Sequence, residues 1–127
     1  MRQLNLVLVQ LLLGASLFAQ PAASMNGKSG NPVFKGWYAD PEGTIFNKQY
    51  WIYPTYSDVY EKQVFMDCFS SPDLVNWTKH DRIIDTSAVK WAHKAMWAPA
   101  IVEKNGKYYL FFAANDIQSD KEYGGIG

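Results

Sequence analysis

The chain has 127 residues and a formal net charge of zero, with 12 basic and 12 acidic side chains. This balance gives no electrostatic reason for binding nucleic acid or an anionic membrane surface, and we exclude both as partners. The 16% share of Phe, Trp and Tyr is typical of aromatic-rich β-sheets.

The first stretch has the residue order of an export signal. Arg2 is followed by an apolar run at residues 4–18 and by small alanines up to Ala23. The run is shorter than the ~20 residues that a membrane-spanning helix needs. We therefore expect residues 1–23 to be a cleaved signal peptide, which makes the mature protein secreted or periplasmic.

Short strands are expected along the rest of the chain. Residues 24–36 are rich in Ser, Gly, Asn and Lys and predict a linker. Beyond them, aromatic and β-branched runs alternate with turn signals, and no stretch shows a helical period. The expected strands cover residues 43–46, 49–53, 63–66, 100–103 and 107–114.

Two of the turns have strong signals of their own. Asn105-Gly106 is among the clearest two-residue hairpin signals and joins the last two expected strands. The segment Ser70–Trp77 contains Pro72 and Asp73, which favour a tight turn leading into a short edge strand.

An internal repeat organises these strands. The segment containing Tyr50-Trp-Ile-Tyr53 aligns with Tyr108-Tyr-Leu-Phe111, and Pro41 aligns with Pro99, all at an offset of 58 residues (99 − 41). Each unit suits one blade of a β-propeller, a repeat fold in which four-stranded sheets surround a central channel. The sequence therefore predicts an all-β, five-bladed propeller, with a first blade at about 37–95 and a second at about 96–127.

The chain is expected to be truncated within its second blade. A blade cannot bury both of its faces alone, and repeat folds need about three units or more. Five blades of this length would need roughly 250 to 300 residues.

Asp40 is the candidate catalytic residue. It lies in Trp37-Tyr-Ala-Asp-Pro-Glu-Gly43, just before the first expected strand of a blade, where a side chain can point into the channel. Ala98 occupies the corresponding position one repeat later. A charge that is present in one blade and absent from the next favours a functional role over a folding role. The alternative is that Asp40 caps a turn before Pro41.

The order of motifs in this chain resembles glycoside hydrolase family 43. The motifs cover nearly all of the expected mature chain, and their combination is specific. They are Asn31-Pro-Val-Phe34, Trp37-Tyr-Ala-Asp-Pro-Glu42, Ser70-Ser-Pro-Asp-Leu-Val-Asn-Trp-Thr78, Met96-Trp-Ala-Pro-Ala100 and Asn105-Gly-Lys-Tyr-Tyr-Leu-Phe-Phe112.

The resemblance implies an inverting hydrolase of arabinofuranosyl or xylosyl linkages, with a plant polysaccharide or oligosaccharide as its partner. Asp40 matches the general base, and the family supplies the general acid as a Glu in a later blade, tuned by another Asp. Neither later residue has a matching position here, so this chain alone is expected to hydrolyse little or nothing. The chain's four glutamates lie outside the acid's motif and receive no role: Glu42, Glu61, Glu103 and Glu122.

Aromatic residues are candidates for the walls of a sugar subsite. Trp37, Trp97 and Phe34 are assigned this role, because aromatic faces pack on the C–H faces of sugar rings; core packing competes with it, above all for Trp97. No cofactor is expected and no metal ligand is assigned, although the sequence leaves open a metal ion at the channel. Cys68 is the sole cysteine, which rules out an intrachain disulfide.

Cys68 is interpreted as a small buried thiol on a strand. Thiol catalysis would need a neighbouring His base, and both histidines, His80 and His93, lie in turn-like polar contexts.

Two other functions stay open. A fructan- or sucrose-acting propeller would use a retaining mechanism with carboxyl groups only ~5 to 5.5 Å apart. Its Asn-Asp-Pro-Asn-Gly motif is not matched, because Ala39 and Glu42 replace the two asparagines. A non-catalytic sugar-binding propeller would use the aromatic residues alone.

Overall fold

The computed structural model describes residues 29–116 and 123–127. Their regular structure is β apart from one short 3-10 helix, which confirms the predicted all-β class. The expected signal peptide and the expected linker up to residue 28 lie outside the described residues. Within the described part of the chain, no helix is long and apolar enough to cross a membrane.

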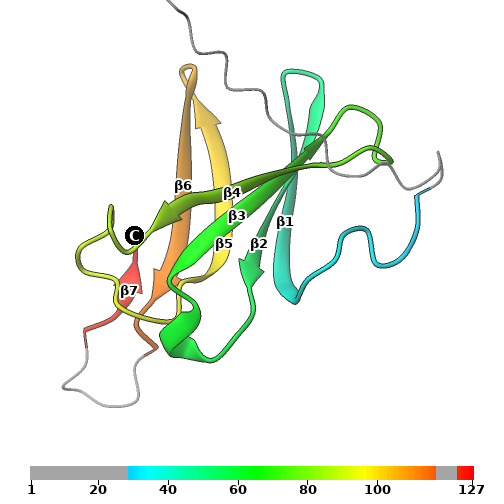
Figure 1. Ribbon diagram of the computed structural model, residues 1–127. Coiled ribbons are helices and arrows are strands. Elements are labelled where there is room, and N and C mark those ends of the chain that lie inside the picture. Colours follow the sequence, from blue (N-terminus) through cyan, green and yellow to red (C-terminus); the bar gives the residue numbers. More distant parts are fainter. Residues whose placement is uncertain (1–28, 117–122) are drawn as a thin grey trace, which may run out of the picture.

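The first sheet is a four-stranded antiparallel meander (Figure 1). Each strand pairs with its neighbour in sequence, and a two-residue turn joins the first pair. This layout is that of a propeller blade. The strands are β1 (Tyr38–Phe46), β2 (Gln49–Tyr56), β3 (Phe65–Ser71) and β4 (Thr78–Asp85).

The second sheet has three strands among the described residues. They are β5 (Trp97–Lys104), β6 (Lys107–Ala114) and the short β7 (Gly125–Ile126), in that order. The Asn105-Gly106 hairpin is confirmed. Its two residues have φ of 55° and 72°, the left-handed conformation that a type I′ turn requires.

The internal repeat is confirmed by strand register. Ile45 of β1 faces Tyr50 of β2, and Glu103 of β5 faces Tyr108 of β6, so both partners are displaced by the same 58 residues (103 − 45 and 108 − 50). The two hairpins are therefore equivalent units.

The outer part of the first sheet differs from the sequence prediction. β3 begins at Phe65 rather than at residue 63, and the residues before it form the 3-10 helix η1 (Tyr60–Lys62), although no helix was expected. The predicted turn is present, but the edge strand β4 that follows it is eight residues long. β4 is mostly polar and only partly buried, so it lacks the strict alternation that marks a half-buried strand.

The two sheets meet at their first strands, where β5 contacts both β1 and β2. The connection between the sheets supplies part of the core, because Ala92 and Met96 are almost fully buried. They pack with Met66 of β3 and with Phe112 and Ala114 of β6. Both sheets and the connection between them therefore contribute to one core.

Candidate active site

Asp40 lies in a bulge of β1. The β1–β2 ladder shifts register between Ala39 and Glu42, so Asp40 and Pro41 have no ladder partner. Asp40 has a φ of 46°, a left-handed conformation that Asp adopts more readily than most residues. Its side chain is exposed rather than buried in the turn. The bulge turns the carboxylate out of the regular pleat and into solvent.

One hydroxyl group holds the Asp40 carboxylate. Thr55 of β2 is 2% exposed, and its hydroxyl donates a hydrogen bond of 3.1 Å to Asp40 Oδ2. This is the one hydrogen-bond partner of the Asp40 side chain within residues 29–116 and 123–127. The carboxylate is thus oriented while its other oxygen stays open to solvent.

The same Thr55 hydroxyl reaches the second sheet. The backbone N–H of Ala98 donates to Thr55 Oγ1 at 2.7 Å. Ala98 lies in the matching bulge of β5, between Trp97 and Ala100, and has a φ of 48°. Ala98 is the counterpart of Asp40 in the second sheet. The two residues are therefore linked by hydrogen bonds to the same buried hydroxyl, that of Thr55.

The two tryptophans proposed for a sugar subsite lie just before the two bulges, Trp37 before Asp40 and Trp97 before Ala98. Trp37 precedes β1 and is 77% exposed, and its carbonyl accepts a hydrogen bond of 2.8 Å from the Ser57 N–H. Trp97 is the first residue of β5 and directly precedes Ala98. Its ring is partly buried and lies 6.4 Å from that of Tyr60. The structure brings the backbone of Trp97 to the Asp40–Thr55 pair.

Phe34 has a packing role. Its ring stacks on Phe69 with centroids 3.7 Å apart and planes 4° from parallel, so one of its faces is occupied. It also lines a pocket of about 270 Å³ together with Ala39 and Pro41, the neighbours of Asp40, but Asp40 itself is not among the lining residues. Phe34 therefore anchors the segment that precedes β1, and its contacts do not reach the Asp40 carboxylate.

A buried acid that sequence reasoning missed supports the start of β1. Asp67 of β3 is 1% exposed and accepts hydrogen bonds of 2.8 Å from the Tyr38 hydroxyl and from the Arg82 N–H. Lys79 of β4 forms an ion pair with this acid, with 2.9 Å between Lys79 Nζ and Asp67 Oδ2. Burial, followed by the hydrogen bond to Asp67, raises the pKa of Tyr38, so the phenol stays a proton donor. This network fixes Tyr38, two residues before Asp40.

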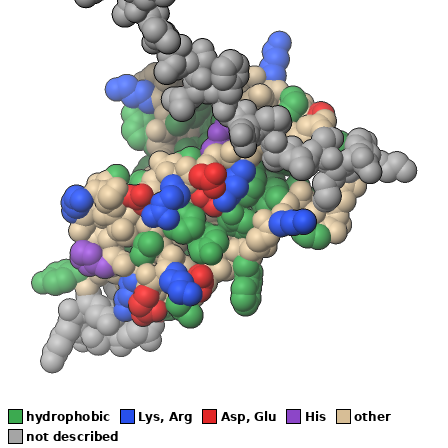
Figure 2. Space-filling view, viewed as in Figure 1, with side chains coloured by type: hydrophobic (Ala, Val, Ile, Leu, Met, Phe, Trp, Pro, Cys, Tyr) green, Lys and Arg blue, Asp and Glu red, His purple; other side chains and the backbone are tan. Residues whose placement is uncertain are grey.

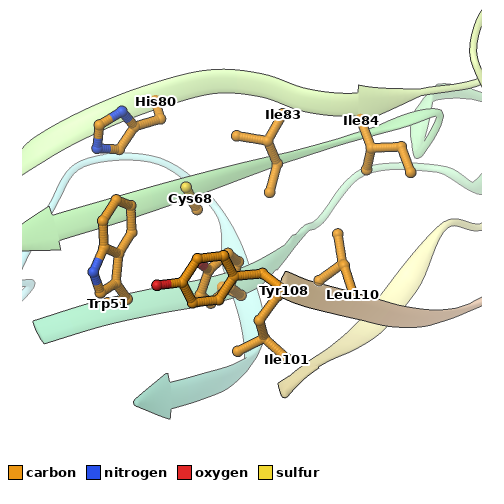
Figure 3. A pocket seen from close by; sticks show the side chains of 9 residues that line it. Trp51, Cys68, His80, Ile83, Ile84, Ile101, Tyr108 and Leu110 are labelled. Carbon is orange, nitrogen blue, oxygen red and sulfur yellow. The ribbon is translucent and has the colours of Figure 1, made fainter. Parts of the chain in front are cut away.

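Cys68 lines an apolar groove between the two sheets, about 410 Å³ in volume (Figure 3). The expectation that Cys68 is a buried thiol on a strand is confirmed. The expectation for His80 was wrong: it lies on β4, directly opposite Cys68, because the polar β4 was not recognised as a long strand. Burial, followed by the charge of Asp67, raises the pKa of Cys68 to about 12, which keeps the thiol protonated.

The His80 ring makes two contacts, one with a hydroxyl group and one with an aromatic ring. Its Nε2 lies 2.8 Å from the Ser70 hydroxyl, and the ring stacks on Trp51 with centroids 5.2 Å apart. Figure 3 shows His80 and Trp51 together at one end of the groove. The groove is therefore a contact region between sheets rather than a thiol-based site.

The remaining carboxylates do not gather around Asp40 to form a metal site. Within the described residues, no group of three or more His, Cys, Asp or Glu side chains could hold a metal ion. Glu103 is exposed at the β5–β6 turn, where it accepts a hydrogen bond from the Gly106 N–H, and Glu122 lies outside the described residues. On the face seen in Figure 2, acidic and basic side chains are interspersed, in line with the balanced total charge.

Comparison with known proteins places this geometry in a family. The sequence profile of glycosyl hydrolases family 43 matches residues 29–126. A β-D-galactofuranosidase of Aspergillus niger is 50% identical over 101 residues, which cover 72% of this chain and 30% of that protein. Xylosidase/arabinosidase 43A of Humicola insolens is 32% identical over 93 residues, which cover 61% of this chain and 28% of that protein.

A solved structure shows the same arrangement of strands. The GH43_1 enzyme of Xanthomonas citri, crystallised with xylotriose, is 26% identical with a TM-score of 0.63, over 75% of this chain and 29% of that one. The chain thus spans about 30% of the length of the relatives it matches. Because the family profile extends over nearly all described residues, the two sheets are blades of the predicted propeller, and the chain belongs to glycosyl hydrolases family 43.

Proposed function

We propose that this chain provides the general base, Asp40, of an inverting hydrolase of arabinofuranosyl or xylosyl linkages in plant cell-wall polysaccharides. One observation carries the proposal: the exposed Asp40 carboxylate sits on a left-handed bulge whose counterpart in the second blade is Ala98. The backbone conformation is the same at both positions, so folding alone does not call for an acid at residue 40.

The geometry suits proton removal from water. Thr55 occupies Asp40 Oδ2, and the second oxygen is free to accept a proton from a water that attacks the anomeric carbon. Inversion also needs a protonated carboxyl group about 6.5 to 9.5 Å away, on the opposite side of the sugar. We place that acid in a later blade, outside this chain, and therefore expect residues 1–127 alone to turn over little substrate.

The substrate class rests on the relatives. The names of the fungal proteins point to galactofuranosyl, xylosyl and arabinosyl units. A β-D-galactofuranosyl and an α-L-arabinofuranosyl ring share their ring configuration and differ in the exocyclic carbon, so an arabinofuranoside fits both descriptions. We propose an α-L-arabinofuranoside as the preferred substrate, with β-D-xyloside and β-D-galactofuranoside as the comparisons. Export through the N-terminal signal would bring the protein to such polysaccharides.

The test uses a chimera that supplies the later blades. Residues 29–126 replace the matching segment of the Aspergillus niger enzyme, and the chimera and the 127-residue chain are assayed on the three aryl glycosides. We expect turnover by the chimera, little by the chain, and a loss of about 10²- to 10⁴-fold in the chimera's kcat on Asp40→Asn. A folded chimera whose kcat survives Asp40→Asn would contradict the proposal.

The same assay separates the alternatives. Proton NMR of the first-formed product gives its anomeric configuration: inversion supports a base, whereas retention would make Asp40 a nucleophile, as in the fructan-acting propellers. A sugar-binding function without catalysis predicts saturable binding by the chimera with no turnover.

A further inference from the structure

We propose that Thr55 is a positioning residue for Asp40 and that it makes the orientation of this carboxylate depend on the docking of the second blade. The inference rests on the proposed role of Asp40 as the general base. Its structural basis is the pair of hydrogen bonds that meet at one buried hydroxyl, from the Ala98 N–H and to Asp40 Oδ2.

The direction of the hydroxyl proton follows from its partners. A backbone N–H only donates, so Thr55 Oγ1 uses a lone pair to accept from Ala98. The hydroxyl has a single proton, which is then left for Asp40 Oδ2. The second blade thus sets Thr55 as a donor toward the carboxylate, and this fixes the direction in which Asp40 Oδ2 points.

The internal repeat supports a functional reason for this pair. Thr55 corresponds to Ala113 in the second blade (113 − 58 = 55), as Asp40 corresponds to Ala98. The paired registers agree, because Thr55 faces Ala39 while Ala113 faces Trp97, the same offset on both strands. Acid and hydroxyl are therefore both present in the first blade and both replaced by alanine in the second.

Burial makes the arrangement rigid. Thr55 is 2% exposed, so water cannot readily replace its two hydrogen bonds, and its β-branched side chain has few rotamers. The carboxylate of Asp40, by contrast, is exposed and has no other partner among the described residues. Without Thr55 the carboxylate would sample several rotamers, and the water it activates would be misplaced.

The kinetic test compares three variants in the chimera. Thr55→Val keeps the side-chain shape but removes the hydroxyl, and we expect kcat to fall about 10- to 100-fold with KM within about twofold. Thr55→Ser restores the hydroxyl and is expected to recover most of kcat. Thr78→Val, on the edge strand β4, is the matched control and should leave both constants unchanged.

Amide hydrogen exchange in the 127-residue chain checks the link between blades. Thr55→Val is expected to speed exchange of the Ala98 N–H, and Thr55→Ser to preserve its protection. Loss of this protection with an unchanged kcat would reduce Thr55 to a contact between blades and overturn the positioning role. If Asp40→Asn also leaves kcat unchanged, the proposed function fails; if only Asp40→Asn lowers it, the positioning role alone fails.

Discussion

The first and second blades place two different side chains on the same backbone. Asp40 and Ala98 occupy equivalent bulges with φ of 46° and 48°, and the strands around them pair in the same register. Only in the first blade does a carboxylate occupy the bulge and a hydroxyl lie beside it. The comparison separates two roles: the bulge belongs to the blade, whereas the acid is an addition that the blade does not need in order to fold.

The largest expected effect comes from making the two positions alike. In the chimera, Asp40→Ala should lower kcat by about 10²- to 10⁴-fold, because the proton acceptor is lost. Its thermal unfolding temperature should change little, because Ala98 shows that alanine tolerates this backbone conformation. The paired measurement is kcat and the unfolding temperature of the same preparation.

The reverse change sharpens the same comparison. Ala98→Asp puts a second carboxylate beside the Thr55 hydroxyl and is expected to leave the dependence on Asp40 intact. Turnover in the double variant Asp40→Ala with Ala98→Asp would show that the two bulges are interchangeable, contrary to the proposal.

A loss of folding stability is expected where the two blades join, and as a free energy it is comparable to the loss of kcat on Asp40→Ala. Met96 is fully buried in the core cluster, whereas Val102 on β5 is 47% exposed. Met96→Ala should lower the free energy of unfolding by about 2 to 5 kcal/mol through lost burial and a residual cavity. Val102→Ala should cost less than about 1 kcal/mol. Urea denaturation of the two variants measures the difference, and equal midpoints would contradict the assignment of the core.

A smaller effect is expected for the network that holds the start of β1. Lys79→Met leaves the buried Asp67 with the Tyr38 hydroxyl and the Arg82 N–H but no cation. The lysine side chain is 38% exposed, so we discount the cost of breaking a fully buried pair to about 1 to 2 kcal/mol. Lys62→Met is the control, because the Lys62 side chain is 68% exposed and its partner Asp58 is not fully buried.

The pH dependence of this network has a definite sign. Burial alone would lower the pKa of Lys79, but the hydrogen bonds to Asp81 and Asp67 outweigh burial and raise it. A raised pKa in the folded protein means that the stabilisation is complete below the usual lysine value of about 10.4 and is lost as pH rises beyond it. The difference in the free energy of unfolding between wild type and Lys79→Met should therefore be constant around pH 7 and shrink in strong alkali.

The sequence revealed the strands that repeat between the two blades, but not the side-chain contacts that occur in one blade alone. The offset of 58 located both hairpins, and Asp40 stood out because Ala98 did not match it. Thr55 was missed although the same offset pairs it with Ala113; a search for coupled differences between repeats would have found it.

Two further omissions have physical reasons. A short edge strand was expected after the turn, but the full length of β4 was missed because it has too little apolar alternation. Within the described residues one edge of β4 is unpaired, and much of the strand is exposed. Phe34 matched a family motif near Asp40, but sequence proximity did not reveal that its ring stacks on Phe69, a contact between segments 35 residues apart (69 − 34).

The smallest expected effect concerns the turn between β3 and β4, which the described part of the second blade does not reproduce. Asp73 accepts hydrogen bonds from the N–H groups of Asn76 and Val75, and these lower its pKa to about 2. A lowered pKa means that the stabilisation is present above the usual Asp value of about 3.9 and is lost as pH falls toward 2. Carbon-13 NMR of the carboxyl group should give a midpoint near that value.

Asp73→Asn distinguishes the charge from the turn itself. The amide oxygen still accepts from the same N–H groups, so the turn persists at neutral pH, but the stabilisation that comes from the charge is lost there. The variant has no carboxyl group to protonate at this position, so its stability should fall less than that of the wild type between about pH 4 and pH 2. Parallel acid unfolding curves for the two proteins would mean that the Asp73 carboxylate is not held by the turn, and that the first blade gains nothing from this charge.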